Sequence, residues 1–362
     1  DPDKRDLYGA LRKYKDSEGY YFTRFVSEGN GTSDSITRLL TGVPDLDLST
    51  SLYARNDFLL NSLKPFKEQG YHCVFITGGQ GSWRSLDTFL RYQGFDEVLE
   101  MSSVRALFPQ ATAGPWGIDD EYVFATVLDY LRKHSDKPQL IWTLSITNHP
   151  PYRVPEGREP QQVQLNEVMR QRFNFPEAPQ IFATLRYAND QLGRLIDEIR
   201  ADPKLAEHTL VAFTGDHNRR GNGYSGYPNE ELIGFEVPFG IVLPEVYRQG
   251  TRFHPERFAS QKDIMPTLAA RALGGVSLHT LGCDFLSDTP CRFPYPYNSE
   301  LAVSADGTYA CPLGGAERVL KLNADHQAEQ ASTSDFDCRL NRALPQLQQA
   351  LYEDLGRCET EA

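Results

Sequence analysis

The chain has 362 residues, of which 40% are apolar, and a formal net charge of −12. This length is enough for one large α/β domain and a smaller second part. The acidic charge argues against nucleic acid as a partner, because binding to its phosphates requires clusters of Lys and Arg. No run of about 18 apolar residues predicts a membrane span, and no basic segment followed by an apolar core predicts a signal peptide. We expect the opening at Asp1-Pro2-Asp3 to be the cut edge of a longer protein.

Strand-like apolar runs alternate with helical patterns along most of the chain. Each run is almost continuously apolar, as expected for parallel strands covered on both faces. The predicted strands are 72–77, 140–146, 209–213 and 239–244. Apolar residues at helical spacing predict helices over 123–131 and 185–199, and a further helix is expected over 6–14. The alternation predicts an α/β fold with a doubly wound, mostly parallel sheet.

The pattern changes after about residue 275. Short strands are expected at 300–305, 308–311 and 318–322, followed by a closing helix near 344–355. We therefore predict a catalytic-type domain over 1–275 and a cysteine-rich C-terminal α+β subdomain over 276–362.

Cysteine usage separates the two parts. Cys73 lies alone in an apolar run and is expected to be a buried thiol. The other five are Cys283, Cys291, Cys311, Cys338 and Cys358. None of their spacings is that of a zinc site, so two disulfides and an oxidising compartment are the better interpretation, with connectivity left open.

Polar side chains follow three of the predicted strands. The segments are Thr77–Arg84, Thr147–Tyr152 and Thr214–Asn218. In open α/β sheets, ligands bind beyond the carboxyl ends of the strands, so these groups should meet at one edge. The adjacent carboxylate and imidazole of Asp216 and His217 suit Mn²⁺, Mg²⁺ or Zn²⁺. The alternative for each segment is a surface turn with incidental polar side chains.

A glycine-rich turn, Glu28–Ser35, runs into a helical pattern. The amino end of a helix favours a phosphate or sulfate. Ser33, Asp34 or Ser35 could instead be an ordinary helix cap. Within this turn, Thr32 would be a poor nucleophile unless a metal lowered its pKa.

Together these motifs resemble the extracellular domain of lipoteichoic acid synthase and its relatives, which are phosphoglycerol transferases with a sulfatase-type fold in the alkaline phosphatase superfamily. The resemblance covers roughly residues 5–285. The matching segments, in order, are Tyr21–Phe25, Gly31–Ser35, Gly70-Tyr71, Ser82–Arg84, Gly94–Asp96, Thr147–Tyr152, Gly215–His217 and Asp263–Leu268.

The resemblance implies specific roles. Thr32 matches the nucleophile, which is also a metal ligand, and Asp216 and His217 match two further ligands. Trp83, Arg84 and His149 match residues that contact the transferred phosphoglycerol group. The implied metal is Mn²⁺, with Mg²⁺ or Zn²⁺ as alternatives.

Two features depart from the family pattern. The family's remaining ligand is a glutamate at the end of a first strand, and that strand is absent upstream of residue 6. The segment Asn218–Gly221 is also more basic than the family pattern.

The implied function is transfer of a phosphoglycerol-type head group from a phospholipid donor to an envelope glycan or glycerol-phosphate acceptor. The parent protein would be membrane-anchored and the domain extracytoplasmic, in the periplasm or on the outer face of the cytoplasmic membrane. A phosphoethanolamine transferase, a phosphodiesterase, a sulfatase-like hydrolase and an inactive binding homologue remain as alternatives. A sulfatase would require a Cys/Ser-x-Pro-x-Arg motif, which does not occur in the sequence.

Overall fold

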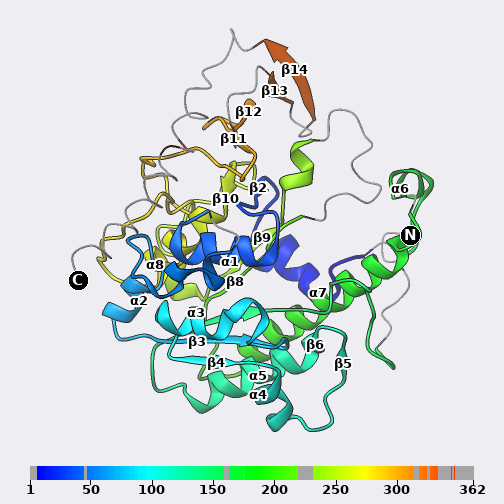
Figure 1. Ribbon diagram of the computed structural model, residues 1–362, viewed down its shortest axis with the longest axis vertical. Coiled ribbons are helices and arrows are strands. Elements are labelled where there is room, and N and C mark those ends of the chain that lie inside the picture. The colour runs from blue at the N-terminus through cyan, green and yellow to red at the C-terminus, as the bar shows by residue number, and fades with distance from the viewer. Residues whose placement is uncertain are drawn as a thin grey trace. The chain divides into compact units, whose positions relative to one another are not determined.

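The structure is a computed structural model that describes residues 6–44, 47–158, 163–173, 175–218, 231–313, 318–323, 327–332, 344 and 346. The chain forms two compact units. Unit 1 comprises Asp1–Tyr20, Phe66–Val211 and Ile241–Arg248, and unit 2 comprises Tyr21–Pro65, Ala212–Gly240 and Gln249–Ala362. Figure 1 shows the elements of both.

The core of unit 1 is a parallel sheet with the strand order β4-β3-β7. Strand β3 (His72–Thr77) pairs in parallel with both β4 (Glu97–Leu99) and β7 (Gln139–Leu144). Two helices, α5 (Asp120–Lys133) and α7 (Ala178–Ala201), contribute apolar side chains to one buried cluster with β3. The buried members of the cluster are Val74, Ile76, Val123, Val127, Tyr130, Leu195, Ile199 and Leu205.

The predicted strands over 72–77 and 318–322 are confirmed without a shift, and the other predicted strands are confirmed with ends shifted by up to two residues. The helices predicted over 123–131 and 185–199 are confirmed and extend further at both ends. The helix expected over 6–14 starts later. Asp6 accepts hydrogen bonds from the backbone N–H groups of Tyr8 and Gly9, so it precedes the helical turns instead of belonging to them. The turns are η2 (Gly9–Leu11) and the π-helical η3 (Tyr14–Glu18).

The remaining elements of unit 1 lie around this sheet. A short antiparallel hairpin joins β5 (Ala113–Gly114) to β6 (Gly117–Ile118). The helices are α3 (Leu86–Tyr92), α4 (Met101–Leu107) and α6 (Glu167–Arg172), and the short turns are η6 (Trp83–Ser85) and η8 (Glu245–Tyr247).

A second sheet has the strand order β1-β9-β8. Its strands are β1 (Tyr20–Phe22), β9 (Phe239–Val242) and β8 (Val211–Thr214). In unit 2, two-residue strands β2 (Phe25–Val26) and β10 (Ala259–Ser260) pair in parallel. The other elements outside the C-terminal sheet are α1 (Thr32–Thr41), α2 (Lys64–Glu68), α8 (Ile264–Ala272), η4 (Leu48–Thr50), η5 (Leu52–Arg55), η7 (Leu232–Phe235) and η9 (Gln261–Asp263).

Phenylalanine rings form the apolar centre of unit 2. Phe22 and Phe285 meet edge to face with ring centroids 4.5 Å apart, and Phe25 stacks on Phe239 at 4.9 Å. All four side chains are almost completely buried. Because aromatic rings bury a large apolar area and prefer these offset geometries, the cluster gives a rigid base for the loops that follow β2 and β8.

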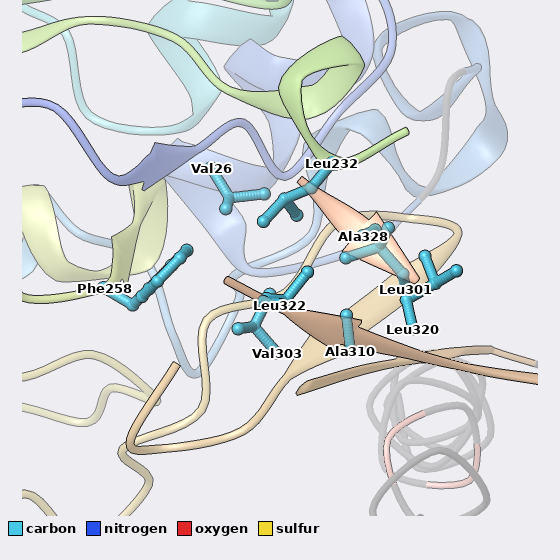
Figure 2. Packing of buried hydrophobic residues seen from close by; sticks show 9 residues of the cluster. All are labelled: Val26, Leu232, Phe258, Leu301, Val303, Ala310, Leu320, Leu322 and Ala328. Carbon is cyan, nitrogen blue, oxygen red and sulfur yellow. The ribbon is translucent and has the colours of Figure 1, made fainter. Parts of the chain in front are cut away.

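The C-terminal strands form a separate antiparallel sheet in chain order. They are β11 (Leu301–Val303), β12 (Tyr309–Pro312), β13 (Arg318–Leu322) and β14 (Ala328–Ser332). Figure 2 shows its buried side chains together with three from elsewhere in unit 2, Val26, Leu232 and Phe258. Three of the four strands were predicted, whereas β14 has no β-branched or aromatic residue and acquires its form from pairing with β13. The predicted closing helix lies outside the described residues apart from 344 and 346, and the domain boundary near 275 stays a prediction.

The cysteines follow the predicted division. Cys283 and Cys291 form a disulfide, and Cys311 is also disulfide-bonded. Cys338 and Cys358 lie outside the described residues. Cys73 is a free, buried thiol whose pKa burial raises to about 12. Among the described helices, none has the length and apolar content needed to cross a membrane.

Candidate functional site

Thr32 is the first residue of α1 and follows the glycine-rich turn. The cap position is taken by Gly31 in extended backbone, with no side-chain capping bond. Of the three cap candidates, Asp34 instead lies in the first turn, where it accepts a bond from the Asn30 N–H at 3.3 Å and pairs with Arg38 at 2.6 Å. The carboxylate in the first turn stabilises the amino end of the helix. Thr32 is thus presented at the positive end of a helix, without a capping side chain in front of it.

The Thr32 hydroxyl and the Asp216 carboxylate are in direct contact. Thr32 Oγ1 donates to Asp216 Oδ2 at 2.5 Å. Ser35, one turn further along α1, donates its hydroxyl to the Asp216 backbone carbonyl at 2.6 Å. Both the side chain and the backbone of Asp216 are therefore bonded to α1. The side chains of Asp216 and His217 remain about one-third exposed, so this site is open to solvent.

The ring of His217 is oriented by a backbone carbonyl. Its Nδ1 lies 2.9 Å from the carbonyl oxygen of Asn218. A carbonyl can only accept, so Nδ1 carries the hydrogen and Nε2 keeps its lone pair in the neutral ring. Asn218 is itself fixed, because its side-chain amide donates to the carbonyls of Ile233 and Glu236, both at 2.7 Å. This is the arrangement by which proteins prepare a histidine Nε2 for a metal.

The donor atoms fit a divalent cation. His217 Nε2 lies 3.6 Å from Asp216 Oδ2, and Thr32 Oγ1 lies 2.5 Å from the same oxygen. A hydroxyl oxygen, a carboxylate and an imidazole nitrogen are donor types by which proteins hold divalent cations. In the described part of the chain, no three His, Cys, Asp or Glu side chains form a metal-binding group. The Thr32 hydroxyl would therefore be the third ligand. Asp1 and Asp3 lie outside the described residues.

A buried carboxyl in the glycine-rich turn before Thr32 was not singled out from the sequence. Glu28 is almost completely buried, and burial raises its pKa to about 7. It accepts a bond from the Lys262 N–H at 2.7 Å. The sequence signal was the position of Glu28 in the glycine-rich turn, but its burial depends on a segment more than two hundred residues away.

Trp83 and Arg84 lie in unit 1, in the η6 turn that follows β3. The Trp83 side chain is 38% exposed. Arg84 and Ser85 have φ angles of 49° and 53°, in the left-handed region that non-glycine residues rarely adopt. Each such residue costs of order 1 kcal/mol, and residues of this kind cluster at functional sites.

His149 lies in the loop that follows β7, also in unit 1. The Asp120 carboxylate accepts bonds from the N–H groups of Ile146 and Thr147, at 2.8 and 3.2 Å. Burial raises the pKa of Asp120 to about 6. The loop before His149 is thus fixed by the first residue of α5. The His149 Nδ1 lies 3.0 Å from the Pro150 carbonyl, which leaves Nε2 available to a ligand.

Trp116 contacts His149 and was missed by sequence reasoning. Their ring centroids lie 4.3 Å apart, and Trp116 Nε1 donates to the same Pro150 carbonyl at 2.6 Å. Trp116 lies at the tip of the β5–β6 hairpin and is 48% exposed. An exposed tryptophan in a Gly-Pro-Trp-Gly turn was the available signal.

The structure therefore divides the predicted site residues into two sets. Thr32, Asp216 and His217 come together in unit 2. Trp83, Arg84 and His149 all lie in unit 1, at the carboxyl ends of β3 and β7.

Comparisons with curated proteins give a consistent set of relatives. Phosphoglycerol transferase I of Citrobacter koseri is 23% identical over 248 residues, which are 64% of this chain and 30% of that protein. The chain thus spans less than a third of the length of this relative.

Solved structures share the fold at low identity. Lipoteichoic acid synthase LtaP from Listeria monocytogenes matches with a TM-score of 0.73 and 17% identity, over 97% of this chain and 86% of that one. Phosphoglycerol transferase GacH from Streptococcus pyogenes, in complex with sn-glycerol-1-phosphate, matches at 0.52 and 16%, over 76% and 72%. The periplasmic domain of EcEptC from Escherichia coli, in complex with Zn, matches at 0.52 and 18%, over 76% of each chain.

The family assignment rests on most of the sequence. The sulfatase family model matches residues 2–275. This range contains the α/β core and all six predicted site residues, while the C-terminal sheet lies beyond it. The chain belongs to the sulfatase family of enzymes.

Proposed function

We propose that this domain transfers a phosphoglycerol-type head group through a covalent intermediate on Thr32. The observation that carries the proposal is the contact between Thr32 Oγ1 and Asp216 Oδ2 at the amino end of α1, with His217 Nε2 beside the same carboxylate. A nucleophile, an acceptor for its proton and a helix end that favours phosphate are thereby combined within a few ångströms.

The residues of unit 2 perform the nucleophilic part. Asp216 accepts the hydrogen of the Thr32 hydroxyl and so orients the oxygen lone pair away from itself. As Thr32 Oγ1 attacks the phosphorus, its proton passes to Asp216, the bond from phosphorus to the diacylglycerol oxygen breaks, and the leaving alkoxide takes up that proton. The intermediate is a glycerophosphoryl ester of Thr32. An acceptor hydroxyl then attacks the phosphorus, the bond to Thr32 Oγ1 breaks, and the acceptor's proton passes through Asp216 to Thr32. The amino end of α1 stabilises the negative charge of the phosphate oxygens throughout.

A divalent cation held by Thr32, Asp216 and His217 would lower the pKa of the threonine hydroxyl and stabilise charge on phosphate. Mn²⁺ is our first choice, with Mg²⁺ or Zn²⁺ as alternatives. An imidazole together with carboxylate and hydroxyl oxygens is compatible with all three. The upstream carboxylate expected from the family pattern would complete the ligand set.

The residues of unit 1 would bind the head group. Arg84 can donate to two phosphate oxygens in a fork, and His149 Nε2, when protonated, can donate to another. Trp83 and Trp116 offer exposed apolar faces that exclude water, which favours transfer to an alcohol over hydrolysis.

The donor would be a phospholipid and the acceptor an envelope glycan or a glycerol phosphate polymer. GacH, which shares the fold, is a phosphoglycerol transferase described with a glycerol phosphate. The Cys283–Cys291 disulfide supports an extracytoplasmic location, because disulfides persist in oxidising compartments. A membrane-anchored parent protein would bring the domain to its donor.

The test uses three soluble substrates with the same chromogenic leaving group: a glycerol phosphodiester, an ethanolamine phosphodiester and a sulfate ester. With Mn²⁺ present, the glycerol phosphodiester should react fastest, and intact mass spectrometry should trap one glycerophosphoryl group on Thr32. Chelation should abolish turnover.

Two variants define the role of Thr32. Thr32→Ala should lose turnover while its melting temperature stays near that of the wild type, and Thr32→Ser should keep part of the activity because it keeps the hydroxyl. Wild-type rates in Thr32→Ala would reject the covalent mechanism. A preference for ethanolamine or sulfate would reassign the substrate, and a protein that binds metal without any turnover would be an inactive binding homologue.

A further inference from the structure

The Gln261 side chain joins the two loops that carry Thr32 and Asp216. It is completely buried in unit 2. Its Nε2 donates to the carbonyl oxygens of Gly215 and Asp216, both at 2.9 Å. Its Oε1 accepts from the N–H of Glu28, also at 2.9 Å. One primary amide therefore bonds to both backbones, with both of its N–H groups and its oxygen in use.

These bonds cross between distant parts of the chain. Thr32 and Asp216 are 184 positions apart in the sequence, and their contact depends on the packing of two separate loops. A misplacement of about 1 Å can reduce a rate about 10²-fold, so the relative position of the two loops matters for turnover. Besides the direct bonds from Thr32 and Ser35 to Asp216, the Gln261 side chain hydrogen-bonds to both loops at once.

A second buried side-chain amide, that of Asn298, bonds to the turn before Thr32 and not to the Asp216 loop. Its Nδ2 donates to the Ser27 carbonyl at 2.6 Å and lies 3.1 Å from Asn30 Oδ1. The neighbouring Ser299 donates its N–H to the Glu28 carbonyl at 2.9 Å. Asn298 is fully buried and comes from the segment just before the C-terminal sheet. This segment therefore fixes the turn that precedes Thr32, and in the described part of the chain Asn298 makes no hydrogen bond to Asp216.

We propose that Gln261 and Asn298 are positioning residues of the Thr32 site, and that they act on different parts of it. Gln261 sets the position of Asp216 relative to Thr32, so it controls both metal affinity and the rate of the chemical step. Asn298 positions only the turn before Thr32, which would be one of the three metal ligands, so its loss should lower the rate and weaken the metal less than the loss of Gln261. The inference rests on the proposed function, and it gives the C-terminal part of the chain a place in the nucleophile site.

The test compares isosteric variants of the full chain. Gln261→Glu keeps the acceptor for Glu28 but replaces the two N–H donors by an oxygen facing two carbonyls. Gln261→Met has a similar length and adds no charge, so it covers the case in which the carboxylate variant does not fold. Asn298→Asp makes the corresponding change at the second amide. Asn189→Asp is the matched control, because Asn189 donates to the Leu7 carbonyl in unit 1.

We expect both Gln261 variants to weaken Mn²⁺ binding about 10- to 100-fold, the range for residues that orient metal ligands. Their kcat at saturating Mn²⁺ should still fall about 10-fold, with KM unchanged because Gln261 does not contact substrate. Asn298→Asp should lower kcat about 10-fold and leave Mn²⁺ affinity within about 3-fold of the wild type. Asn189→Asp should change none of these constants.

Three outcomes overturn the inference. Gln261 variants with lower melting temperatures but wild-type Mn²⁺ affinity and kcat would show a structural role only. Equal loss of Mn²⁺ affinity in the Gln261 and Asn298 variants would contradict the division between them, and an equal effect in Asn189→Asp would show a general stability effect. If the wild type itself neither binds Mn²⁺ nor turns over, the proposed function fails first, which is a distinguishable result.

Discussion

The Thr32 region of unit 2 and the His149 region of unit 1 are built in different ways. Thr32 and Asp216 are bonded to each other, and the loops behind them are locked by the buried side chains of Gln261 and Asn298. His149, in contrast, is exposed and is held by its own loop and by the half-exposed Trp116. The covalent and metal chemistry proposed for the Thr32 region requires atoms fixed to a fraction of an ångström, whereas the head-group binding proposed for the His149 region tolerates adjustable surface side chains.

The largest expected loss of turnover comes from removing the carboxylate of Asp216 from the Thr32 region. Asp216→Asn keeps the shape and an acceptor for Thr32 but removes the charge, so turnover should fall about 10³-fold or more and Mn²⁺ affinity should fall with it. Turnover and isothermal titration with Mn²⁺ measure the two effects. Asp306→Asn, a carboxylate in the C-terminal sheet region of the same unit, is the control and should retain both. Retention of Mn²⁺ affinity by Asp216→Asn would remove Asp216 from the ligand set.

Substitutions in the His149 region of unit 1 should lower turnover without changing metal affinity. His149→Ala and Arg84→Ala should each lower kcat/KM about 10²-fold while Mn²⁺ affinity stays at the wild-type value, because these side chains belong to unit 1 and not to the ligand set. Arg91→Ala, an exposed arginine on α3 of the same unit, is the matched control. A loss of metal in either variant, or unchanged turnover in both, would show that the head-group assignment is wrong.

Each region also contains one buried carboxyl whose pKa is raised by burial, to about 7 for Glu28 and about 6 for Asp120. The folded protein keeps these protons at pH values where the unfolded chain has lost them. The free energy of unfolding should therefore fall as pH rises from about 4 to each folded pKa, by about 3 kcal/mol per group.

Glu28→Gln and Asp120→Asn should each remove one of these falls in the free energy of unfolding. The free energy of unfolding of each variant should therefore depend less on pH than that of the wild type, and above pH 7 the variant should gain stability relative to the wild type. Urea unfolding at about pH 5 and pH 8 measures the difference. Asp306 should affect stability in the opposite direction. The Ser304 hydroxyl lowers the pKa of Asp306, so its contribution to the free energy of unfolding is present at neutral pH and is lost in acid. An unchanged pH slope in Glu28→Gln would mean that this carboxyl is ionised in the folded protein without cost.

The smallest effect is expected at the contact between Trp116 and His149. Trp116→Phe keeps an aromatic ring against the histidine but loses the bond from Nε1 to the Pro150 carbonyl, worth about 1 kcal/mol. We expect kcat/KM to fall about 3- to 10-fold, and Trp116→Ala to fall further. If Trp116→Phe and Trp116→Ala both match the wild type, the tryptophan does not position His149.

The sequence predicted the elements whose signals are local. The apolar run of β3 and the periodic faces of α5 and α7 are visible in the residues themselves, because burial on both faces or on one face leaves a pattern. The grouping of Asp216 and His217 with Thr32 followed from the family resemblance, whereas the rule that strand ends carry ligand groups applied only to the segment that contains Asp216 and His217. The structure brings these three together.

The rest depended on contacts across long sequence distances. Gln261 lies inside the capping-box pattern Ser260–Asp263, which predicts a helix start but says nothing of the Gln261 side chain, whose contacts with two other loops arise only in the fold. Glu28 looks like a surface carboxylate in a glycine-rich turn until residues 260–262 cover it. Strand β14 lacks residues that favour strands and is defined by its partner β13. No single-residue signal encodes such pairings.

The close approach of the β5–β6 hairpin to the end of β3 has a consequence for engineering. A Cβ atom on Gly117 would lie 2.0 Å from the Gly78 oxygen, and one on Gly78 would lie 2.2 Å from the Ile118 oxygen. Gly117 also has a φ of 143°. A mutagenesis library aimed at new head groups should therefore leave both glycines unchanged and diversify Trp83 and Trp116. The residues at the hairpin tip can then be replaced together, because the hairpin is held against the end of β3 by backbone contacts at Gly78 and Gly117 that such replacements leave in place.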